Sequence, residues 1–168
     1  SKIFNSDFVS LLNKRNKMNW LDLLEIIPEN TLKIAFFDPQ YRWVLDKMWY
    51  GNEGKNRWKN RSELPQMTEE IIENFIKKIE IALLPNGYLF LWVDKFHLLE
   101  WVKKWLNDTP RLSIVDMITW DKQKIWMGYR TRRRSEYIVI IQKFPRKAKS
   151  TWILHNIPDV WAEKLSSK

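Results

Sequence analysis

The residues best suited to chemistry are an aspartate, a proline and a tyrosine that follow a short apolar run. They are Asp38, Pro39 and Tyr41, within the stretch FFDPQYRW that begins at Phe36. A carboxylate accepts hydrogen bonds from an exocyclic amine, and the proline carbonyl can be directed at the same amine. A tyrosine ring offers a flat face on which a base can stack. Two acceptors and a ring would hold an amino-purine, although an Asp-Pro turn that merely ends a strand would use the same residues.

Two basic segments carry aromatic rings among their cations. Cations bind phosphates and rings stack on bases, so this mixture favours a nucleic acid as the partner. The net charge of +9 also favours a polyanionic partner. The alternatives are an exposed hairpin loop for 121–134 and a surface charged for solubility. The residues concerned are Trp126, Tyr129, Arg130, Arg132, Arg133 and Arg134 in the segment 121–134, and Lys55, Arg57, Lys59 and Arg61 in the segment 51–65.

The composition excludes several classes of protein. The 168 residues suffice for one domain with a buried core, and 45% of them are hydrophobic. The chain has no cysteine for a disulfide or a thiolate metal site, and its two histidines, His97 and His155, are too isolated to predict a zinc centre. No apolar run reaches the roughly 18 residues of a membrane helix, and the first ten residues lack a signal-peptide pattern. We therefore expect a soluble intracellular protein without a metal site.

Helical and strand patterns alternate along the chain. Alternation of this kind indicates an α/β fold with a mostly parallel sheet. A loop too short for a helix joins the last two strands, so we expect them to pair antiparallel at one edge of the sheet. The spacing of apolar residues predicts helices over 16–27, 68–83 and 96–106, and strands over 33–37, 88–93, 112–120 and 136–142, with a further short strand at Ile3 and Phe4.

Asp38 and Asp94 each follow one of the predicted strands. The carboxyl ends of parallel strands meet at one edge of a sheet, and ligands of open α/β sheets bind at that edge. We therefore predict that Asp38 and Tyr41 share one concave site there, with Asp94 nearby.

Three stretches, in this order, resemble the motifs of one enzyme family. They are LLEIIPENTLKIAFFDPQY, ALLPNGYLFLWVDKFH and GYRTRRRSEYIVIIQK, and the segment IPDVW adds to the match. The chain resembles the amino-methyltransferases that modify DNA, and among them the adenine-N6 group in its permuted order, the beta class with a D-P-P-Y motif. The match extends over nearly the whole chain. It implies a Rossmann-like S-adenosylmethionine methyltransferase sheet, in a single methyltransferase-like domain over residues 1–168 with basic loops at 51–65 and 121–134.

The resemblance also implies roles for individual residues. Asp38 and the Pro39 carbonyl would hold the N6 amine of a flipped adenine, with Tyr41 stacked on its ring. Glu136 and Tyr137 match a Glu-Tyr pair that lies near the flipped base. The implied cofactor is S-adenosylmethionine, with Asp7 and Asp38 as its contacts. The implied partner is double-stranded DNA in the cytoplasm of a bacterial or phage-infected cell, bound by Lys55, Arg57, Arg61, Trp126, Tyr129, Arg130, Arg132, Arg133 and Arg134.

The sequence departs from the family pattern at two places. Gln40 replaces the second proline of D-P-P-Y, while Asp38, Pro39 and Tyr41 are kept. In the permuted order a His-Pro-x-x-Lys-Pro segment and a Phe-x-Gly-x-Gly loop should follow, but the chain has four glycines and no Gly-x-Gly. We therefore expect a fragment of a longer protein, or a chain whose cofactor half comes from a second subunit, and no methylation by these residues alone.

Three other functions stay open at this level. A chain without the glycine-rich loop could be a catalytically silent nucleic-acid-binding subunit of a methyltransferase complex. RNA adenine methyltransferases carry D-P-P-W, and Tyr41 in place of tryptophan favours DNA. Cytosine-N4 methyltransferases resemble the adenine group but usually carry serine where Asp38 stands, so Asp38 favours adenine.

Overall fold

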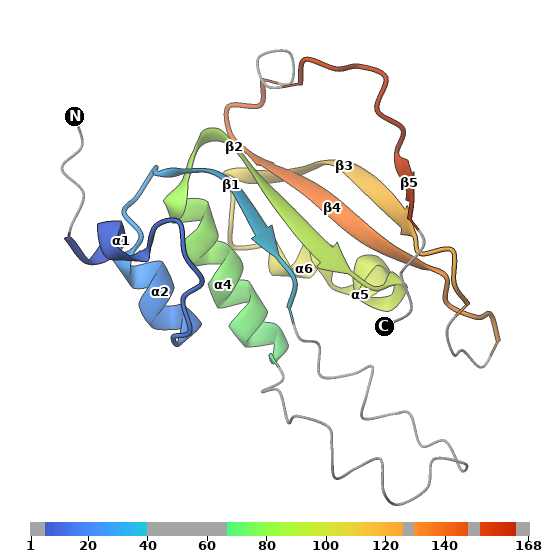
Figure 1. Ribbon diagram of the computed structural model, residues 1–168, viewed down its shortest axis with the longest axis horizontal. Coiled ribbons are helices and arrows are strands. Elements are labelled where there is room, and N and C mark those ends of the chain that lie inside the picture. The colour runs from blue at the N-terminus through green and yellow to red at the C-terminus, as the bar shows by residue number, and fades with distance from the viewer. Residues whose placement is uncertain (1–5, 40–66, 126–129, 148–151, 164–168) are drawn as a thin grey trace, which may run out of the picture.

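The computed structural model describes residues 6–39, 67–125, 130–147 and 152–163, and these form an α/β fold (Figure 1). The described helices are α1 (Ser6–Leu11), α2 (Trp20–Ile26), α4 (Glu69–Ala82), α5 (Lys95–Glu100) and α6 (Val102–Trp105). The strands are β1 (Leu32–Phe37), β2 (Leu83–Val93), β3 (Leu112–Asp121), β4 (Ser135–Lys143) and β5 (Val160–Ala162). In the described part, no helix has the length and apolarity needed to cross a bilayer.

The five strands form one mixed sheet in the order β1-β2-β4-β3-β5. β1 pairs parallel with β2, and β3 pairs parallel with β5, whereas β4 is antiparallel to both of its neighbours. The predicted α/β class and the antiparallel pairing of β3 with β4 are therefore confirmed. The predicted position of the antiparallel strand was wrong, because β4 lies between β2 and β3 rather than at the edge. After β2, the chain forms β3 one position further along the sheet. A hairpin then brings β4 back into the position between β2 and β3.

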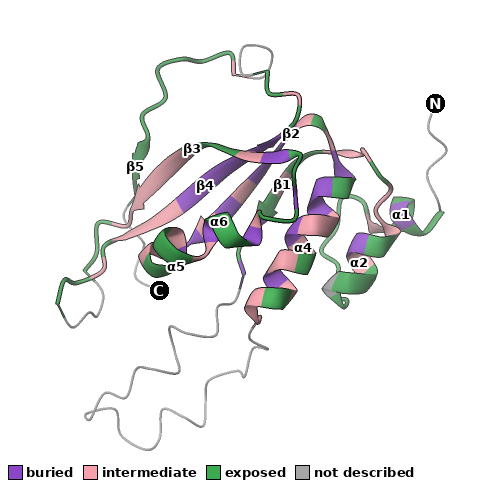
Figure 2. Cartoon of the chain, turned by 180° about the vertical axis from the view of Figure 1, so that it is seen from behind, coloured by how far each residue is buried: buried purple, intermediate pink, exposed green. Residues whose placement is uncertain are grey.

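One face of the sheet is covered by helices, as the two opposite views show (Figures 1 and 2). α4 places an apolar stripe on this face, and Thr68 caps the helix by accepting a hydrogen bond from the Ile71 amide. Residues opposite one another across paired strands share a face. The core on this side consists of Ile72, Ile76, Ile79 and Trp105 from the helices, and Leu89, Leu91, Val139 and Ile141 from the strands.

A buried lysine of the sheet connects it to the helix layer through hydrogen bonds. The side chain of Lys143, in β4, is 2% exposed, and its Nζ donates to the carbonyls of Glu80 at 2.5 Å and Leu83 at 2.6 Å. Nζ also donates to Asn30 Oδ1 at 3.1 Å. The ammonium group thus satisfies carbonyls at the C-terminal end of α4, which have no partner within the helix.

We call the opposite face of the sheet the second face, and none of the described helices covers it. The register places Ile34 and Phe36 of β1 on this face, in line with Tyr88 and Phe90 of β2. Ile34 is 50% exposed and Phe36 is 69% exposed, although both are large apolar residues. The second face therefore carries an exposed apolar surface along β1, which is an edge strand of the described sheet.

The predicted elements differ from the observed ones mainly at their ends. The helix over 16–27 begins at Trp20, where Asn19 accepts a hydrogen bond from the Leu21 amide. The helix over 96–106 is divided at Trp101 into α5 and α6. α1 and β5 were not predicted, and the strand expected at residues 3 and 4 lies outside the described residues.

The strand predicted over 88–93 begins earlier, at Leu83, because it contains an irregular turn. Leu32 pairs with Leu83 and Ile34 pairs with Tyr88, so the extra residues of β2 between these pairs form a bulge. Asn86 in this bulge has φ of 69°. A Cβ at Gly87 would lie 2.8 Å from the carbonyl oxygen of Leu84 in the same bulge and 3.2 Å from that of Leu32 in β1, so the bulge needs glycine at this position.

Candidate active site

Several charged residues meet at one edge of the sheet. β1, β2 and β3 run in the same direction, so their carboxyl ends lie together with the amino end of the antiparallel β4. Asp38 directly follows β1 and Asp94 directly follows β2. Asp121 ends β3 opposite Ser135, which begins β4. This is the edge at which ligands bind in α/β sheets, as the sequence predicted for Asp38 and Asp94.

Asp38 continues the line of β1 side chains that begins with Ile34 and Phe36, so it lies on the second face. The Asp38 side chain is exposed, whereas Pro39 is buried. Surrounding protein atoms still raise the pKa of Asp38 by desolvation, and the nearby Glu136 carboxylate raises it further, while Lys122 acts in the opposite sense. The raised pKa makes Asp38 a stronger hydrogen-bond acceptor than an isolated aspartate.

Glu136 and Lys122 form an ion pair beside Asp38. Glu136 is the second residue of β4, and Lys122 follows the end of β3. Lys122 Nζ also lies 5.4 Å from the ring centroid of Trp120, within cation–π range. The Trp120 Nε1–H is buried and has no acceptor among the described residues. The edge therefore holds two carboxylates and one cation in contact with aromatic surface.

Asp94 has a structural role at the same edge. Its Oδ1 accepts hydrogen bonds from the amides of Phe96 and His97, both at 2.9 Å, and lies 3.0 Å from His97 Nδ1. Burial alone would raise the pKa of Asp94, but the hydrogen bonds from His97 and Phe96 outweigh it and hold the pKa below its usual value. The other oxygen, Oδ2, is buried and has no partner in the described part of the chain. Asp94 therefore caps α5 and is not a freely available site carboxylate.

The Asp94 cap continues into a buried polar network. His97 is 3% exposed and stacks on Trp105, with ring centroids 5.8 Å apart. Its Nε2 lies 3.9 Å from Glu69 Oε1, and Trp105 Nε1 donates to Glu69 Oε2 at 2.7 Å. The network joins α4, α5 and α6 beneath the edge that carries Asp38. It was not foreseen from the sequence, although an aspartate directly before a helical pattern is a recognisable cap.

Aromatic residues extend from Asp38 across the second face. Phe36 stacks on Phe90 with ring centroids 5.1 Å apart, and Trp92 lies 6.1 Å from Phe36. The Trp152 indole N–H donates to the Tyr88 hydroxyl at 3.0 Å. Rings with exposed faces are suitable for stacking on a base or a nucleoside.

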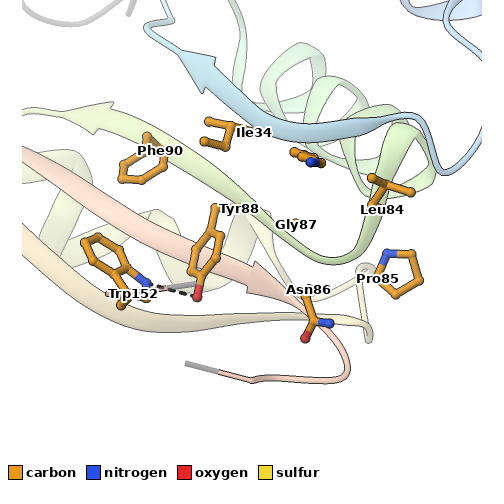
Figure 3. A pocket seen from close by; sticks show the side chains of 9 residues that line it. Ile34, Leu84, Pro85, Asn86, Gly87, Tyr88, Phe90 and Trp152 are labelled. Atoms are coloured by element: carbon orange, nitrogen blue, oxygen red, sulfur yellow. Dashed lines mark hydrogen bonds between the residues drawn. The ribbon is translucent and has the colours of Figure 1, made fainter. Parts of the chain in front are cut away.

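Two of the hollows that the described residues line lie on the second face, away from Asp38. One, of about 450 Å³, is lined mainly by apolar residues at the amino ends of β1 and β2, including Ile34, Gly87 and Tyr88 (Figure 3). The other, of about 270 Å³, lies between the segment 154–159 and the strands β3 and β4. Trp152 lines both hollows, and Asp38 lines neither. The concave site predicted for Asp38 and Tyr41 stays a prediction, since Tyr41 lies outside the described residues.

Of the other predicted site residues, some lie in the described part of the chain and some lie outside it. Asp7 is exposed in the first turn of α1, which lies beside α2, and its cofactor contact stays a prediction (Figure 1). The predictions for Lys55, Arg57, Arg61, Trp126 and Tyr129 concern residues outside the described part.

The four predicted arginines have different surroundings. Arg134 makes two hydrogen bonds to Asp121, from Nε at 2.6 Å and from a terminal nitrogen at 2.8 Å. This bidentate pair lowers the pKa of Asp121 and raises that of Arg134. Arg133 is partly buried, whereas Arg130 and Arg132 are exposed. Sequence alone did not distinguish the four.

Comparison with known proteins decides the family. No protein-family model matches the chain. The type II methyltransferase M.HhaII of Haemophilus parahaemolyticus is 72% identical over 162 residues, which cover 96% of this chain and 71% of that protein. This chain belongs to the type II methyltransferases. The expectation of a methyltransferase, drawn from the ordered motifs, is confirmed.

Solved structures confirm the methyltransferase fold. PvuII DNA methyltransferase, described as cytosine-N4-specific, superimposes with a TM-score of 0.60 at 12% identity, over 90% of this chain and 57% of its own length. A DNA modification methylase from Thermus thermophilus, solved with S-adenosyl-L-methionine, gives 0.54 at 14% identity, over 85% and 65% respectively. The type II methyltransferase chain thus spans less than two thirds of each of these two structures.

Lys122 was not predicted as a site residue from the sequence. Its signal was weak, because it is one of 29 lysines and arginines and follows a strand without any motif. The Glu-Tyr pair implied by the family resemblance does include Glu136, which is close enough to Asp38 to influence its pKa.

Proposed function

We propose that this chain is the base-binding part of a site-specific DNA methyltransferase that transfers a methyl group from S-adenosylmethionine to adenine N6. The observation that carries the proposal is the Asp38-Pro39 step at the carboxyl end of β1, in a chain that is 72% identical to a type II methyltransferase. The carboxyl end of a parallel strand is the usual ligand edge of such sheets. Asp38 lies there on the face that no described helix covers.

Asp38 supports the transfer by positioning the amine. Its carboxylate accepts a hydrogen bond from an N6–H, and the Pro39 carbonyl accepts the other, which directs the nitrogen lone pair out of the ring plane. The raised pKa of Asp38 strengthens this hydrogen bond and favours uptake of the proton that the amine loses. When bound, S-adenosylmethionine supplies a methyl group already activated on a sulfonium. Positioning then contributes most of the acceleration.

The choice of adenine rests on Asp38. The PvuII structure is described as cytosine-N4-specific, but its identity of 12% supports the fold and not the base. In the families that this sequence resembles, the cytosine-N4 enzymes usually carry serine at the position of Asp38, and the adenine enzymes carry aspartate there. The alternatives are RNA as the substrate and a catalytically silent nucleic-acid-binding subunit of a methyltransferase complex, and a measurement of activity would separate them.

The residues of this chain fit the base side of the reaction better than the cofactor side. The exposed apolar part of the second face adjoins Asp38, and β1 is an edge strand of the described sheet. We infer that the rest of the methyltransferase, from a further segment or a second subunit, covers this surface and supplies the cofactor loop. Calorimetric titration of the 168 residues with S-adenosylmethionine should give no binding, and micromolar binding would show that these residues build the cofactor site.

The activity test uses the full-length methyltransferase with the variants Asp38→Ala and Asp116→Ala. Asp116 is exposed in β3, and its carboxylate accepts only a hydrogen bond from the neighbouring Met117 amide among the described contacts. We expect Asp38→Ala to lower kcat about a hundred-fold or more with little change in DNA affinity, because a group that orients the reacting atom is lost. Asp116→Ala should behave as wild type. A kcat for Asp38→Ala within about three-fold of wild type would refute the role of Asp38.

The proposed function also implies a cellular location. DNA methylation of this kind takes place where the chromosome or the phage genome lies, in the cytoplasm of a bacterial or phage-infected cell. The net charge of +9 supports a polyanionic substrate.

A further inference from the structure

An exposed phenylalanine at the amino end of α5 lies close to two cations. The Phe96 ring is 51% exposed, although phenylalanine is normally buried. Lys95 Nζ lies 5.2 Å from its centroid, and the guanidinium carbon of Arg133 lies 5.6 Å from it. Both distances are within the range of cation–π attraction. The ring therefore connects α5 to the segment 130–134, which is distant in sequence.

A second contact joins the same two elements. Lys95 Nζ donates to Thr131 Oγ1 at 3.2 Å. The first turn of α5 is itself held by the Asp94 carboxylate, which accepts hydrogen bonds from the amides of Phe96 and His97. A continuous set of contacts thus leads from the end of β2, at the edge that carries Asp38, through Phe96 to Arg133. The segment 130–134 is anchored to the candidate active site rather than projecting freely into solvent.

The arginines of this segment divide into two pairs. Arg133 is occupied by Phe96, and Arg134 is occupied by Asp121 through a bidentate pair. Arg130 and Arg132 are exposed and form no ion pair with any residue of the described chain. A guanidinium fork that is already bonded to a carboxylate must lose that bond before it can bind a phosphate. Arg130 and Arg132 are therefore the cations best placed to contact a polyanion.

We propose that Phe96 is a positioning residue that holds the DNA-binding segment 130–134 at the candidate active site. In this arrangement Arg133 and Arg134 anchor the segment, and Arg130 and Arg132 bind phosphates. The inference rests on the proposed function, because it takes DNA as the partner. In this role Phe96 does not itself bind a phosphate; it increases the fraction of molecules in which the segment is held at the sheet edge. It does not change the number of phosphate contacts.

The test measures DNA binding by variants of the full-length protein at several salt concentrations. The probe is a fluorescently labelled duplex of mixed sequence, about two helical turns long, and its anisotropy reports binding. The variants are Phe96→Ala, Phe96→Tyr and Leu99→Ala, together with Arg130→Ala and Arg132→Ala. Leu99 is the matched control, because it lies in the same helix and is 81% exposed. Thermal unfolding of each variant monitors folding.

We expect Phe96→Ala to weaken binding about two- to five-fold at every salt concentration, with an unchanged salt dependence. Phe96→Tyr should retain wild-type affinity, because it keeps an aromatic face, and Leu99→Ala should also match wild type. Arg130→Ala and Arg132→Ala should each lower the slope of log affinity against log salt by about 0.9. This pattern separates a residue that places the segment from one that binds a phosphate.

The outcomes distinguish this inference from the proposed function. If wild type shows no salt-dependent binding to the duplex, the assignment of DNA as the partner fails. If wild type binds and Phe96→Ala binds equally well, or loses salt slope as the arginine variants do, the positioning role of Phe96 is wrong. If Phe96→Ala unfolds, Phe96→Leu takes its place, since leucine keeps the apolar contact and removes the aromatic face. Wild-type affinity in Phe96→Leu would likewise overturn the inference.

Discussion

Replacing Asp94 with alanine should destabilise the protein strongly, because one carboxylate oxygen serves three donors. Oδ1 caps α5 through two amides at 2.9 Å and lies 3.0 Å from Nδ1 of the buried His97. Loss of an N-cap costs about 0.5–2 kcal/mol. Loss of a hydrogen bond between a charged group and a buried ring adds about 1.5–3 kcal/mol. Since the same oxygen is shared, we expect a total of about 2–4 kcal/mol.

The loss can be measured by urea unfolding followed by tryptophan fluorescence at neutral pH. Asp108→Ala is the matched control, because Asp108 pairs with Lys77 at 2.8 Å but is 69% exposed. An exposed pair of this kind is worth less than about 1 kcal/mol. A loss below about 1 kcal/mol for Asp94→Ala would show that the cap and the His97 contact do not hold α5 as described.

The same variant tests the direction of the Asp94 pKa. Because hydrogen bonds hold the folded pKa below its usual value, the stabilisation is fully present above the ordinary carboxyl pKa of about 4. It is lost as the pH falls through the lower, folded value. The unfolding free energies of wild type and Asp94→Ala should therefore converge on acidification. A difference that grows towards acid pH would mean that the folded pKa is raised instead.

Three further predictions follow from particular contacts. Glu136→Gln should move the acid limb of the pH–rate profile of methylation to lower pH, because the Glu136 carboxylate helps to raise the pKa of Asp38 and the reaction needs Asp38 ionised. An acid limb that moves to higher pH would contradict this electrostatic assignment. Lys143→Met should cost about 3 kcal/mol in urea unfolding, since two buried carbonyls at the end of α4 lose their donor; a loss near zero would mean that water replaces the ammonium group. Gly87→Ala should cost about 1–3 kcal/mol in the same assay, because its Cβ would lie 2.8 Å from a backbone oxygen; wild-type stability would show that the bulge can relax.

The sequence predicted the location of Asp38 well because the relevant signal is local. An apolar run that stops at Asp-Pro has to end a strand, and a helix between two parallel strands brings both carboxyl ends to one edge. The order of the strands was harder to predict, because hairpin geometry fixes the pairing of β3 with β4 but not the partner on the other side of β4. The short β5 carries no alternating pattern, since all three of its residues are exposed.

Asp94 shows how one residue type can support two interpretations. An aspartate after a strand indicated a ligand-binding edge, but an aspartate before a helix is also a cap, and the structure assigns it to the cap. Likewise, the short apolar run from Lys33 to Phe37 indicated a buried strand. Phe37 is 7% exposed and Phe36 is 69% exposed, so only one face is covered in the described chain. An apolar sequence does not reveal which partner covers the second face.

The central claim is that Asp38 holds an adenine amine for methylation. The most direct test incubates the full-length methyltransferase with S-adenosylmethionine and unmethylated DNA, digests the DNA to nucleosides and identifies the methylated base by mass spectrometry. We predict N6-methyladenine with wild type and its loss with Asp38→Ala. N4-methylcytosine as the product, or undiminished N6-methyladenine with Asp38→Ala, would contradict the claim.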